Sequence, residues 1–411
     1  VPAALQSEGH AHSGSDRLLP RGDRETGPRA GRHLSANLVV RPVRTGADLN
    51  RFIDLPYQLH ARDLSWVPPL RRDVELLLSP KKNPFFEHAE AAYFLAERDG
   101  TVVGRIGAIH NRLHNTTHGD QVGFFGFFES IDDLAVTEAL CAEASRWLAA
   151  RGLTTMRGPA SPSVNDEYGL LISAFDRPNT IMMPHNPSYY PSLLERAGLT
   201  VVRTLVAFEG GREDRAIPAP ERIVRAVDLA KKRYGVTIRA LRLSDFKAEV
   251  DRVKSLYNRC WEDNWGAVPM TDHEIDHLAA QFRPVVVPEM VPFAEKDGVP
   301  IGFGLALPDF NQVLRSNRKG RIFPAALKLL WSLKTRRLRR ARILLLGVLP
   351  EYRGKGVDAA LYHWIWTHST ARQIYWGEAG WVLEDNPAMN AGLVKMGFTP
   401  YKRFAIYERP T

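Results

Sequence analysis

The chain repeats itself at a spacing close to half its length, and this limits the folds that it can adopt. Three landmarks recur in the same order: the Asp-Gly turns at Asp99 and Asp297 (297 − 99 = 198), the Asn-Pro pairs at Asn186 and Asn386 (386 − 186 = 200), and the helix-ending glycines Gly198 and Gly397 (397 − 198 = 199). Each Asp-Gly pair joins two apolar runs, which is typical of a β-hairpin. Chance can produce one such match, but three matches in order indicate a duplicated unit.

The pattern predicts the same elements in each half: strand, helix, two hairpin strands, strand, helix, strand, helix, strand. Hairpins mixed with strand–helix–strand crossovers predict an α/β (mixed α+β) fold, with two similar domains that are each a mixed sheet flanked by helices. A chain of 411 residues also exceeds the usual size of one hydrophobic core. The expected divisions are a disordered tail over 1–36, a domain over 37–210, a linker with a helix over 211–235, and a domain over 236–411.

A basic turn in the second half has the composition of an anion site. The apolar run 343–348 stops before Pro350, and the Gly-rich turn 353–356 leads into a helical pattern. A strand that opens through such a turn into a helix points several backbone N–H groups at one place, and the helix dipole adds positive potential. The pattern favours phosphate binding, although Arg-Gly-Lys-Gly is also a common surface turn.

In these residues the second half resembles the GNAT acyltransferase superfamily. Val348, Pro350, Arg353 and Gly356 match its cofactor motif, while Asp358 stands where Gly or Ala is usual. The resemblance implies acyl-CoA or acetyl-CoA as a co-substrate and no metal. The residues that it assigns to the cofactor are Val348, Leu349, Arg353, Gly354, Lys355, Gly356, Val357 and Asn386.

A later motif, an asparagine before a helix that ends in Gly-Phe, matches residues 386–398, and the resemblance to a tandem bacterial GNAT group runs from 38 to 409. Some members of that group are similar to bacterial ceramide synthases, which join a fatty acyl group to a sphingoid amine. The implied function is N-acyl transfer from acyl-CoA to an amine, with a long-chain amine as the finer expectation. A catalytically silent acyl-CoA or lipid-binding module is the alternative, since Leu393 occupies the position of the superfamily's proton-donating Tyr. Tyr362 or water would then protonate the leaving thiolate.

The first half lacks the basic turn, because the equivalent residues 129–133 are acidic. We therefore expect the second half to bind the cofactor and the first half to shape the acceptor pocket, with its insertion around 158–175 as part of that pocket. Glu384 and Glu167 are the candidates for the base that removes the ammonium proton. Asp385, beside Glu384, is expected to cap the helix that follows. The residues expected to contact the acceptor are Asn165, Glu262, Asn264, Trp265, Asp309 and Asn311.

Residues 315–342, the basic segment, hold eleven Arg and Lys residues interleaved with Leu, Phe and Trp. Basic residues beside an apolar face are typical of a helix that lies on an anionic membrane, and a solvated helix packed through its leucines is the alternative. The net charge of +9 agrees with an anionic partner, but no motif for nucleic acid is present. With two cysteines and no metal-ligand spacing, a cytoplasmic protein is expected, peripheral to the inner face of the membrane if the basic segment binds lipid.

Overall fold

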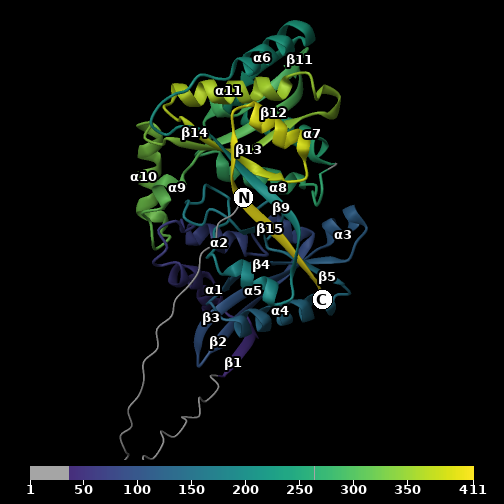
Figure 1. The fold of residues 1–411 in the computed structure, drawn as a ribbon, viewed down its shortest axis with the longest axis vertical. Coiled ribbons are helices and arrows are strands. Elements are labelled where there is room, and N and C mark those ends of the chain that lie inside the picture. Colours follow the sequence, from purple (N-terminus) through teal and green to yellow (C-terminus); the bar gives the residue numbers. More distant parts are fainter. Residues whose placement is uncertain (1–36, 263) are drawn as a thin grey trace, which may run out of the picture. The chain divides into compact units, whose positions relative to one another are not determined.

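The computed structural model describes residues 37–262 and 264–411, and the predicted tail over 1–36 lies outside them. Residues 37–411 form one compact unit (Figure 1). The elements of the first half are β1 (Leu38–Pro42), α1 (Gly46–Leu59), α2 (Arg71–Leu77), η1 (Pro84–Glu87), β2 (Ala89–Arg98), β3 (Thr101–Asn111), α3 (Arg112–His118), β4 (Val122–Ser130), α4 (Leu134–Ala149), β5 (Thr155–Gly158), β6 (Ala160–Ser161), β7 (Glu167–Tyr168), β8 (Leu170–Leu171), α5 (Tyr190–Arg196) and β9 (Thr200–Gly211). The elements of the second half are α6 (Glu221–Tyr234), β10 (Val236–Ala240), η2 (Leu243–Asp245), α7 (Phe246–Trp261), α8 (Asp272–Phe282), η3 (Pro288–Met290), β11 (Pro292–Lys296), β12 (Val299–Pro308), α9 (Asn311–Leu314), α10 (Ile322–Lys334), β13 (Arg340–Val348), η4 (Pro350–Tyr352), α11 (Val357–Ala371), β14 (Trp376–Leu383), α12 (Pro387–Lys395) and β15 (Thr399–Pro410).

One mixed sheet of 13 strands runs through both halves in the order β1-β2-β3-β4-β5-β15-β9-β14-β13-β12-β11-β10, with β8 paired to β15. Strands β6 and β7 form a separate pair. Helices cover both faces of the sheet. In the second half α7 packs on one face through Phe293 and Phe303, and α6 and α11 pack on the other face through Ala294 and Ile301. This architecture confirms the expected fold class.

The duplication is visible in strand register. Leu38 of β1 pairs with Arg98 of β2, and Val236 of β10 pairs with Lys296 of β11, each 198 residues later (236 − 38 and 296 − 98). The Asp-Gly turns that follow have positive φ in both halves, at Asp99–Gly100 and Asp297–Gly298. Local turn chemistry therefore fixes the same hairpin twice.

The last strand of each half is exchanged with the other half. Strand β15 pairs antiparallel with β5 of the first half, and β9 of the first half pairs antiparallel with β14 (Figure 1). The two exchanged strands also pair with each other over most of their length. Hydrogen bonds of one continuous ladder therefore join the halves, and the division at residues 210 and 236 stays a prediction about the chain's ancestry rather than a visible boundary.

Side-chain caps explain where several helices begin. Helix α4 begins at Leu134 because the Asp133 carboxylate accepts a hydrogen bond from the Ala135 amide at 2.9 Å. Helix α8 begins with a capping box between Thr271 and Glu274. Within the described ranges, no helix is both long and apolar enough to cross a bilayer.

Candidate functional site

Strands β13 and β14 separate part-way along their length. They pair in parallel from Arg340–Trp376 to Ile343–Ala379, and no further pair follows although β13 continues to Val348. Strand β14 bends away at Gly380, whose φ of 147° and close approach to Ala207 favour glycine. The second half of β13 therefore presents a strand edge that no neighbouring strand occupies.

The basic turn lies at the end of that edge. Gly354 and Gly356 have φ of 72° and 77°, a left-handed conformation that glycine adopts without steric cost. Among the described residues, the amides of Gly354, Lys355 and Gly356 donate no hydrogen bond to a protein acceptor. The Asp358 side chain is exposed and leaves the turn open. A row of free amides at the start of α11, a 15-residue helix, fits the diphosphate of a CoA thioester.

The two basic side chains of the turn hold its shape. The Arg353 guanidinium donates to the carbonyl oxygens of Cys260 at 2.9 Å and Val348 at 3.4 Å. Lys355 Nζ donates to the Glu351 carbonyl oxygen at 2.8 Å. Both side chains remain at the surface of the turn and add positive potential there.

The residue that caps α12 is not the expected Asp385 but its neighbour Asn386. Asn386 is the cap of α12, since its side chain accepts from the Met389 amide at 3.1 Å. Asp385 instead lies 3.6 Å from Arg203, so its predicted role as a cap is wrong. Glu384 is half-exposed and accepts from Arg403 Nε at 3.2 Å. Its carboxylate is thus tied to a surface arginine.

In the first half the corresponding space is filled by the chain itself. Strands β4 and β5 also separate after three parallel pairs, from Val122–Thr155 to Phe124–Arg157. A Cβ added to Gly126 would lie 1.7 Å from the Ala160 carbonyl oxygen, so β6 is seated directly against β4. The Phe127 amide donates to Ser161 Oγ at 2.9 Å. Only the second half therefore keeps both the strand edge and the turn.

The insertion that fills the first half carries Glu167 toward the second half. Its neighbour Tyr168 is buried, with its ring 5.6 Å from that of Trp381, which directly follows the bend of β14. The Glu167 side chain is accessible to solvent but surrounded by protein, and desolvation raises its pKa against the opposing charge of Arg342. An accessible carboxyl group with a raised pKa is suited to proton transfer.

Asp166, the other carboxyl group of this loop, is also perturbed. Burial raises the pKa of Asp166 to about 7, against a hydrogen bond that its carboxylate accepts from Ser163 Oγ at 2.7 Å. Asn165 connects the loop to the second half, because its side chain bonds to Tyr257 and to the Val268 carbonyl. The 163–168 loop is therefore packed between the halves.

A buried ionic cluster that the sequence did not reveal lies under the bend of β14. Arg342 donates to the carbonyl oxygens of Ile181 at 2.6 Å and Gly380 at 2.8 Å, and its Nε lies 3.4 Å from Glu378. The fully buried Glu378 also accepts from Thr180 Oγ1 at 2.5 Å and from the Tyr401 hydroxyl. The signal in the sequence was a charged residue inside each of two largely apolar strands, Arg342 in β13 and Glu378 in β14.

The remaining predicted acceptor residues fall into two groups. Asp309 and Asn311 are buried and bond to the backbone of Ile181 and Asn179, so they hold the segment beside Glu378. The guanidinium groups of Arg157 and Arg203 lie 5.0 and 4.9 Å from the centroid of the Trp265 ring. Glu262 and Asn264 are exposed on the loop after α7. The structure brings Asn165 to the 264–268 loop but does not gather all six residues at one point.

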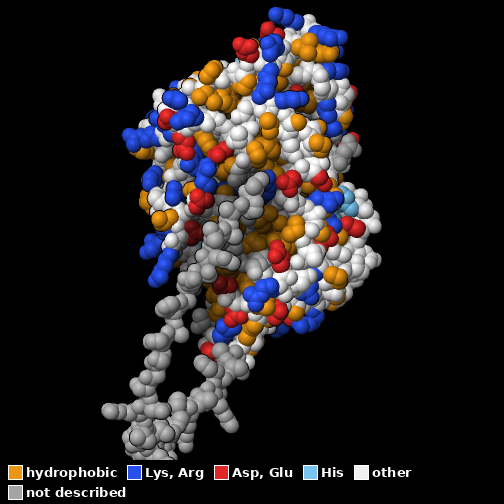
Figure 2. Space-filling model, in the orientation of Figure 1, with side chains coloured by type: hydrophobic (Ala, Val, Ile, Leu, Met, Phe, Trp, Pro, Cys, Tyr) orange, Lys and Arg blue, Asp and Glu red, His pale blue; other side chains and the backbone are white. Residues whose placement is uncertain are grey.

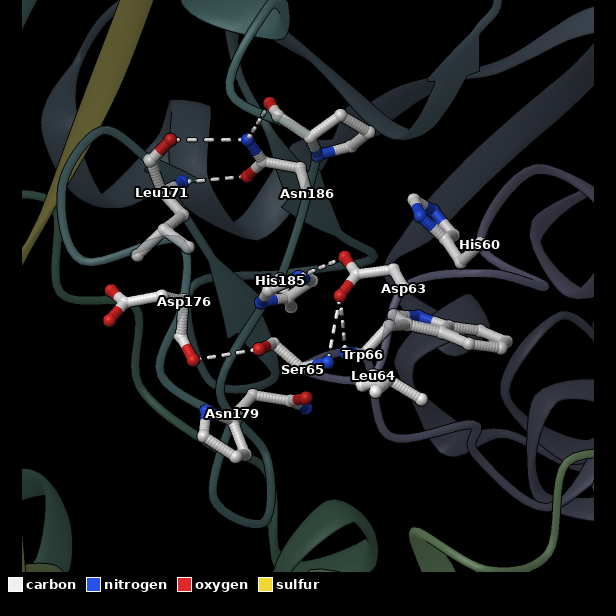
Figure 3. A network of polar contacts seen from close by, with 12 residues as sticks. His60, Asp63, Leu64, Ser65, Trp66, Leu171, Asp176, Asn179, His185 and Asn186 are labelled. Carbon is white, nitrogen blue, oxygen red and sulfur yellow. Dashed lines mark hydrogen bonds and ion pairs between the residues drawn. The ribbon is translucent and has the colours of Figure 1, made fainter.

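Two further acid–histidine pairs lie in the first half. His185 Nε2 is 2.7 Å from Asp63, whose other oxygen accepts from the amides of Ser65 and Trp66 (Figure 3). His60 Nε2 lies 2.9 Å from the buried Glu129. The first pair joins two loops, and the second joins the end of α1 to β4. The described residues contain no group of three potential metal ligands.

Comparison with known proteins finds relatives that cover most of the chain. The model of the acetyltransferase (GNAT) family matches residues 250–398, the part that carries the turn. A protein named bacterial ceramide synthase, from Caulobacter vibrioides (strain NA1000 / CB15N), is 37% identical over 383 residues, which are 91% of this chain and 98% of that protein. Protein YghO from Escherichia coli (strain K12) is 35% identical over 382 residues, 92% and 96% of the two chains. A tandem GNAT protein from the clavulanic acid biosynthesis pathway has a similar fold, with a TM-score of 0.55 at 14% identity, covering 91% of this chain and 98% of that one.

Proposed function

Because the chain belongs to the GNAT acyltransferase family, we propose that it transfers an acyl group from acyl-CoA to the primary amine of a long-chain, sphingoid-type acceptor. The observation that carries this proposal is the contrast between the halves. The second half keeps an open strand edge that leads into a turn with free amides, whereas the first half fills the same space with β6. Its relative named bacterial ceramide synthase supports an amine of the sphingoid class.

The proposed chemistry is direct attack of the amine on the thioester. The nitrogen forms a bond to the carbonyl carbon, the C–S bond breaks, and the CoA thiolate leaves with a proton from solvent. The backbone amide of Val348, on the edge of β13 that β14 leaves unpaired, would stabilise the oxyanion, since the Leu349 amide already donates to the Ile301 carbonyl oxygen at 3.0 Å. The ammonium proton passes to Glu167, whose raised pKa makes its carboxylate a better proton acceptor than that of an ordinary Glu.

Tyr362 does not fit the role of proton donor to the leaving thiolate. Its side chain is buried, and its ring packs 5.3 Å from that of Phe398 in the core under α11. Leu393 is buried in the same cluster. Solvent is therefore the proton source in this proposal, which a thiol of moderate pKa permits.

The basic segment supports a location at a lipid surface. Helix α10 has the reverse of the usual burial pattern. The small residues Ala325 and Ser332 are buried, while the large apolar residues Phe323, Leu327 and Trp331 are 66%, 56% and 49% exposed. Basic side chains lie beside this apolar stripe at one edge of the molecule (Figure 2), and no acidic residue occurs between Asp309 and Glu351. We propose that α10 lies on anionic lipid at the cytoplasmic face, where a long-chain amine would be found.

The proposal is tested with the purified chain, palmitoyl-CoA and sphinganine, by measuring released CoA thiol and the N-acyl product by mass spectrometry. Amine-dependent thiol release with formation of the amide is expected. Binding of acyl-CoA without thiol release, across amines of short, medium and long chains, would establish the catalytically silent module instead.

A further inference from the structure

An apolar cavity lies in the second half between helices α7 and α8 and the face of the sheet that they cover. Its volume is about 80 Å³, and its wall is almost entirely hydrocarbon. Residues from three sides contribute: Val253 and Tyr257 from α7, Leu278 from α8, and Leu305 and Leu345 from the sheet. A water molecule in such a space would lack polar partners, so the cavity favours an apolar occupant.

The sheet side of the cavity is unusual for a protein core. Leu305 of β12 and Leu345 of β13 are direct partners in the middle of the sheet, beneath two helices. Both leucines are only partly buried, whereas their neighbours Phe303 and Ala306 are fully buried. Central residues that remain accessible under a helix layer indicate a space that reaches the surface.

The first half shows what this space looks like when it is filled. There the rings of Phe52, Tyr93 and Phe127 pack together, with centroids 5.3 to 6.3 Å apart. Tyr93 corresponds to Val291 by the offset of 198 residues, since the Val43 and Leu241 amides bond to the two equivalent carbonyl oxygens.

The other two rings also have aliphatic counterparts in the second half. Val122 of β4 and Arg340 of β13 are the first residues of the two parallel pairings, which gives an offset of 218 residues between these strands (340 − 122 = 218). By this offset Phe127 corresponds to Leu345. Asp48 pairs with Arg41 in the first half, and Glu249 pairs with Arg239 in the second. Phe52 and Val253 each follow these carboxylates by four residues, so they correspond. Three aromatic rings in one half are thus three aliphatic side chains around the cavity in the other.

Two contacts connect the cavity with the proposed reaction site. Leu345 lies three residues before Val348, on the part of β13 that β14 leaves unpaired. At the other side the Tyr257 hydroxyl bonds to Asn165 at 3.4 Å, in the loop that carries Glu167. The cavity therefore adjoins both the strand expected to hold the thioester and the loop that faces the acceptor.

We infer that this cavity is the place where the hydrocarbon chain of a long-chain acyl-CoA binds. The inference rests on the proposed function and adds to it the position of the acyl chain in the fold. The alkyl chain of the acceptor has the same chemistry, but the position of Leu345 on the cofactor strand assigns the cavity to the donor. Each buried methylene would tighten binding by about four-fold.

The test is the equilibrium dissociation constant of CoA, butanoyl-CoA and palmitoyl-CoA, measured by calorimetry below the micelle concentration of palmitoyl-CoA. The wild-type chain is expected to bind palmitoyl-CoA at least 100-fold more tightly than CoA. Val253→Phe and Val291→Tyr, which restore the rings of the first half, are expected to weaken palmitoyl-CoA at least ten-fold relative to CoA. Val299→Phe, at the exposed start of β12, is the matched control and should leave that ratio at the wild-type value.

Equal affinity of the wild-type chain for CoA and palmitoyl-CoA would overturn the inference, as would filled variants that bind both like wild type. If a variant loses CoA binding as well, Ala279→Phe fills the cavity from α8 instead. The affinity for palmitoyl-CoA relative to CoA is then measured on this variant. Strong preference for palmitoyl-CoA without thiol release would support the cavity and reject the transferase. Equal thiol release from butanoyl-CoA and palmitoyl-CoA, together with equal affinities for them, would support the transferase and reject the cavity as the acyl site. A preference that sphinganine abolishes by competition alone would assign the cavity to the acceptor and overturn the inference.

Discussion

Tyr168 and Trp381 pack their rings 5.6 Å apart, and this contact holds the insertion of the first half against the bend of β14 in the second. Glu167 precedes Tyr168, so the same contact sets the position of the carboxyl group that we propose as the base. Its pKa is raised by desolvation, with Glu129 adding to the effect and Arg342 opposing it. In this proposal the half that lacks the basic turn supplies a side chain to the half that carries it.

Glu167→Gln is expected to lower kcat by about 10²- to 10⁴-fold, the usual loss for a general base, with unchanged affinity for acyl-CoA. A base acts when deprotonated, so wild-type activity should fall as the pH drops through its raised pKa, above the value of an ordinary Glu. The pH dependence of kcat/KM checks this, and its acid limb should flatten in the variant. Glu384→Gln is the control, since that carboxylate pairs with Arg403 at the surface. Loss of activity in Glu384→Gln but not in Glu167→Gln would show that Glu384 is the base and Glu167 is not.

Arg353→Ala is expected to weaken acyl-CoA binding at least ten-fold, about 1.4 kcal/mol. The guanidinium ties the turn to the carbonyl oxygens of Val348 and Cys260, so its loss releases the turn from this position as well as removing charge. Calorimetry measures the change. Arg259→Ala removes a neighbouring exposed arginine that pairs with Glu351, and this control should bind like wild type. Equal affinity of the wild-type chain and both variants for acyl-CoA would show that the turn is not part of the cofactor site.

Arg342→Ala is expected to lower the free energy of unfolding by about 3–5 kcal/mol, because it leaves the buried Glu378 carboxylate without its cation. Denaturant unfolding measures this change. Glu378→Gln in the Arg342→Ala background should recover part of the loss, since it removes the uncompensated charge. A double variant that is as unstable as the sum of both single variants would show that the two groups are not coupled.

Asp309→Asn is expected to flatten the pH dependence of stability. Burial, with Glu378 nearby, raises the pKa of Asp309 to about 7, while an unfolded Asp titrates near 3.9. The folded state therefore holds a proton that the unfolded state has lost. The stabilisation from this group is complete below the unfolded pKa and disappears as the pH rises toward and through 7. The difference between wild type and variant, from unfolding at a series of pH values, should amount to a few kcal/mol.

Much of the fold could be predicted because its signals are local. The Asp-Gly turns at Asp99 and Asp297 and the positive-φ glycines at 354 and 356 set their own backbone geometry, so the hairpins and the basic turn follow from short segments. The exchange of β9 and β15 could not be predicted, because either strand offers the same alternating pattern to two possible neighbours.

The site was only partly predictable for the same reason. Glu167 was recognised as a candidate from the polar residues around it, yet its proximity to Arg342 depends on the packing of Tyr168 against a residue more than 200 positions away. The pair Arg342–Glu378 depends on the parallel register of β13 and β14, which a sequence pattern does not specify. Asp385 was expected to cap α12, but Asn386 does so because the next residue is Pro387 at the first helical position.

Replacement of Leu327 and Trp331 by Glu is expected to abolish co-sedimentation of the chain with vesicles that contain anionic phosphatidylglycerol. These side chains are exposed on α10 and would enter the lipid interface, and the basic neighbours would attract its headgroups. Neutralising Lys334, Arg336 and Arg337 should weaken binding by about 1 kcal/mol per charge at low salt.

The matched control neutralises three exposed lysines elsewhere, Lys81, Lys82 and Lys247, and should bind vesicles like wild type. Vesicles of phosphatidylcholine alone should bind the wild-type chain weakly, since they offer the apolar interior without the charge. If the α10 variants sediment like wild type, the exposed stripe serves a contact other than lipid, and the acceptor amine must reach the site from solution.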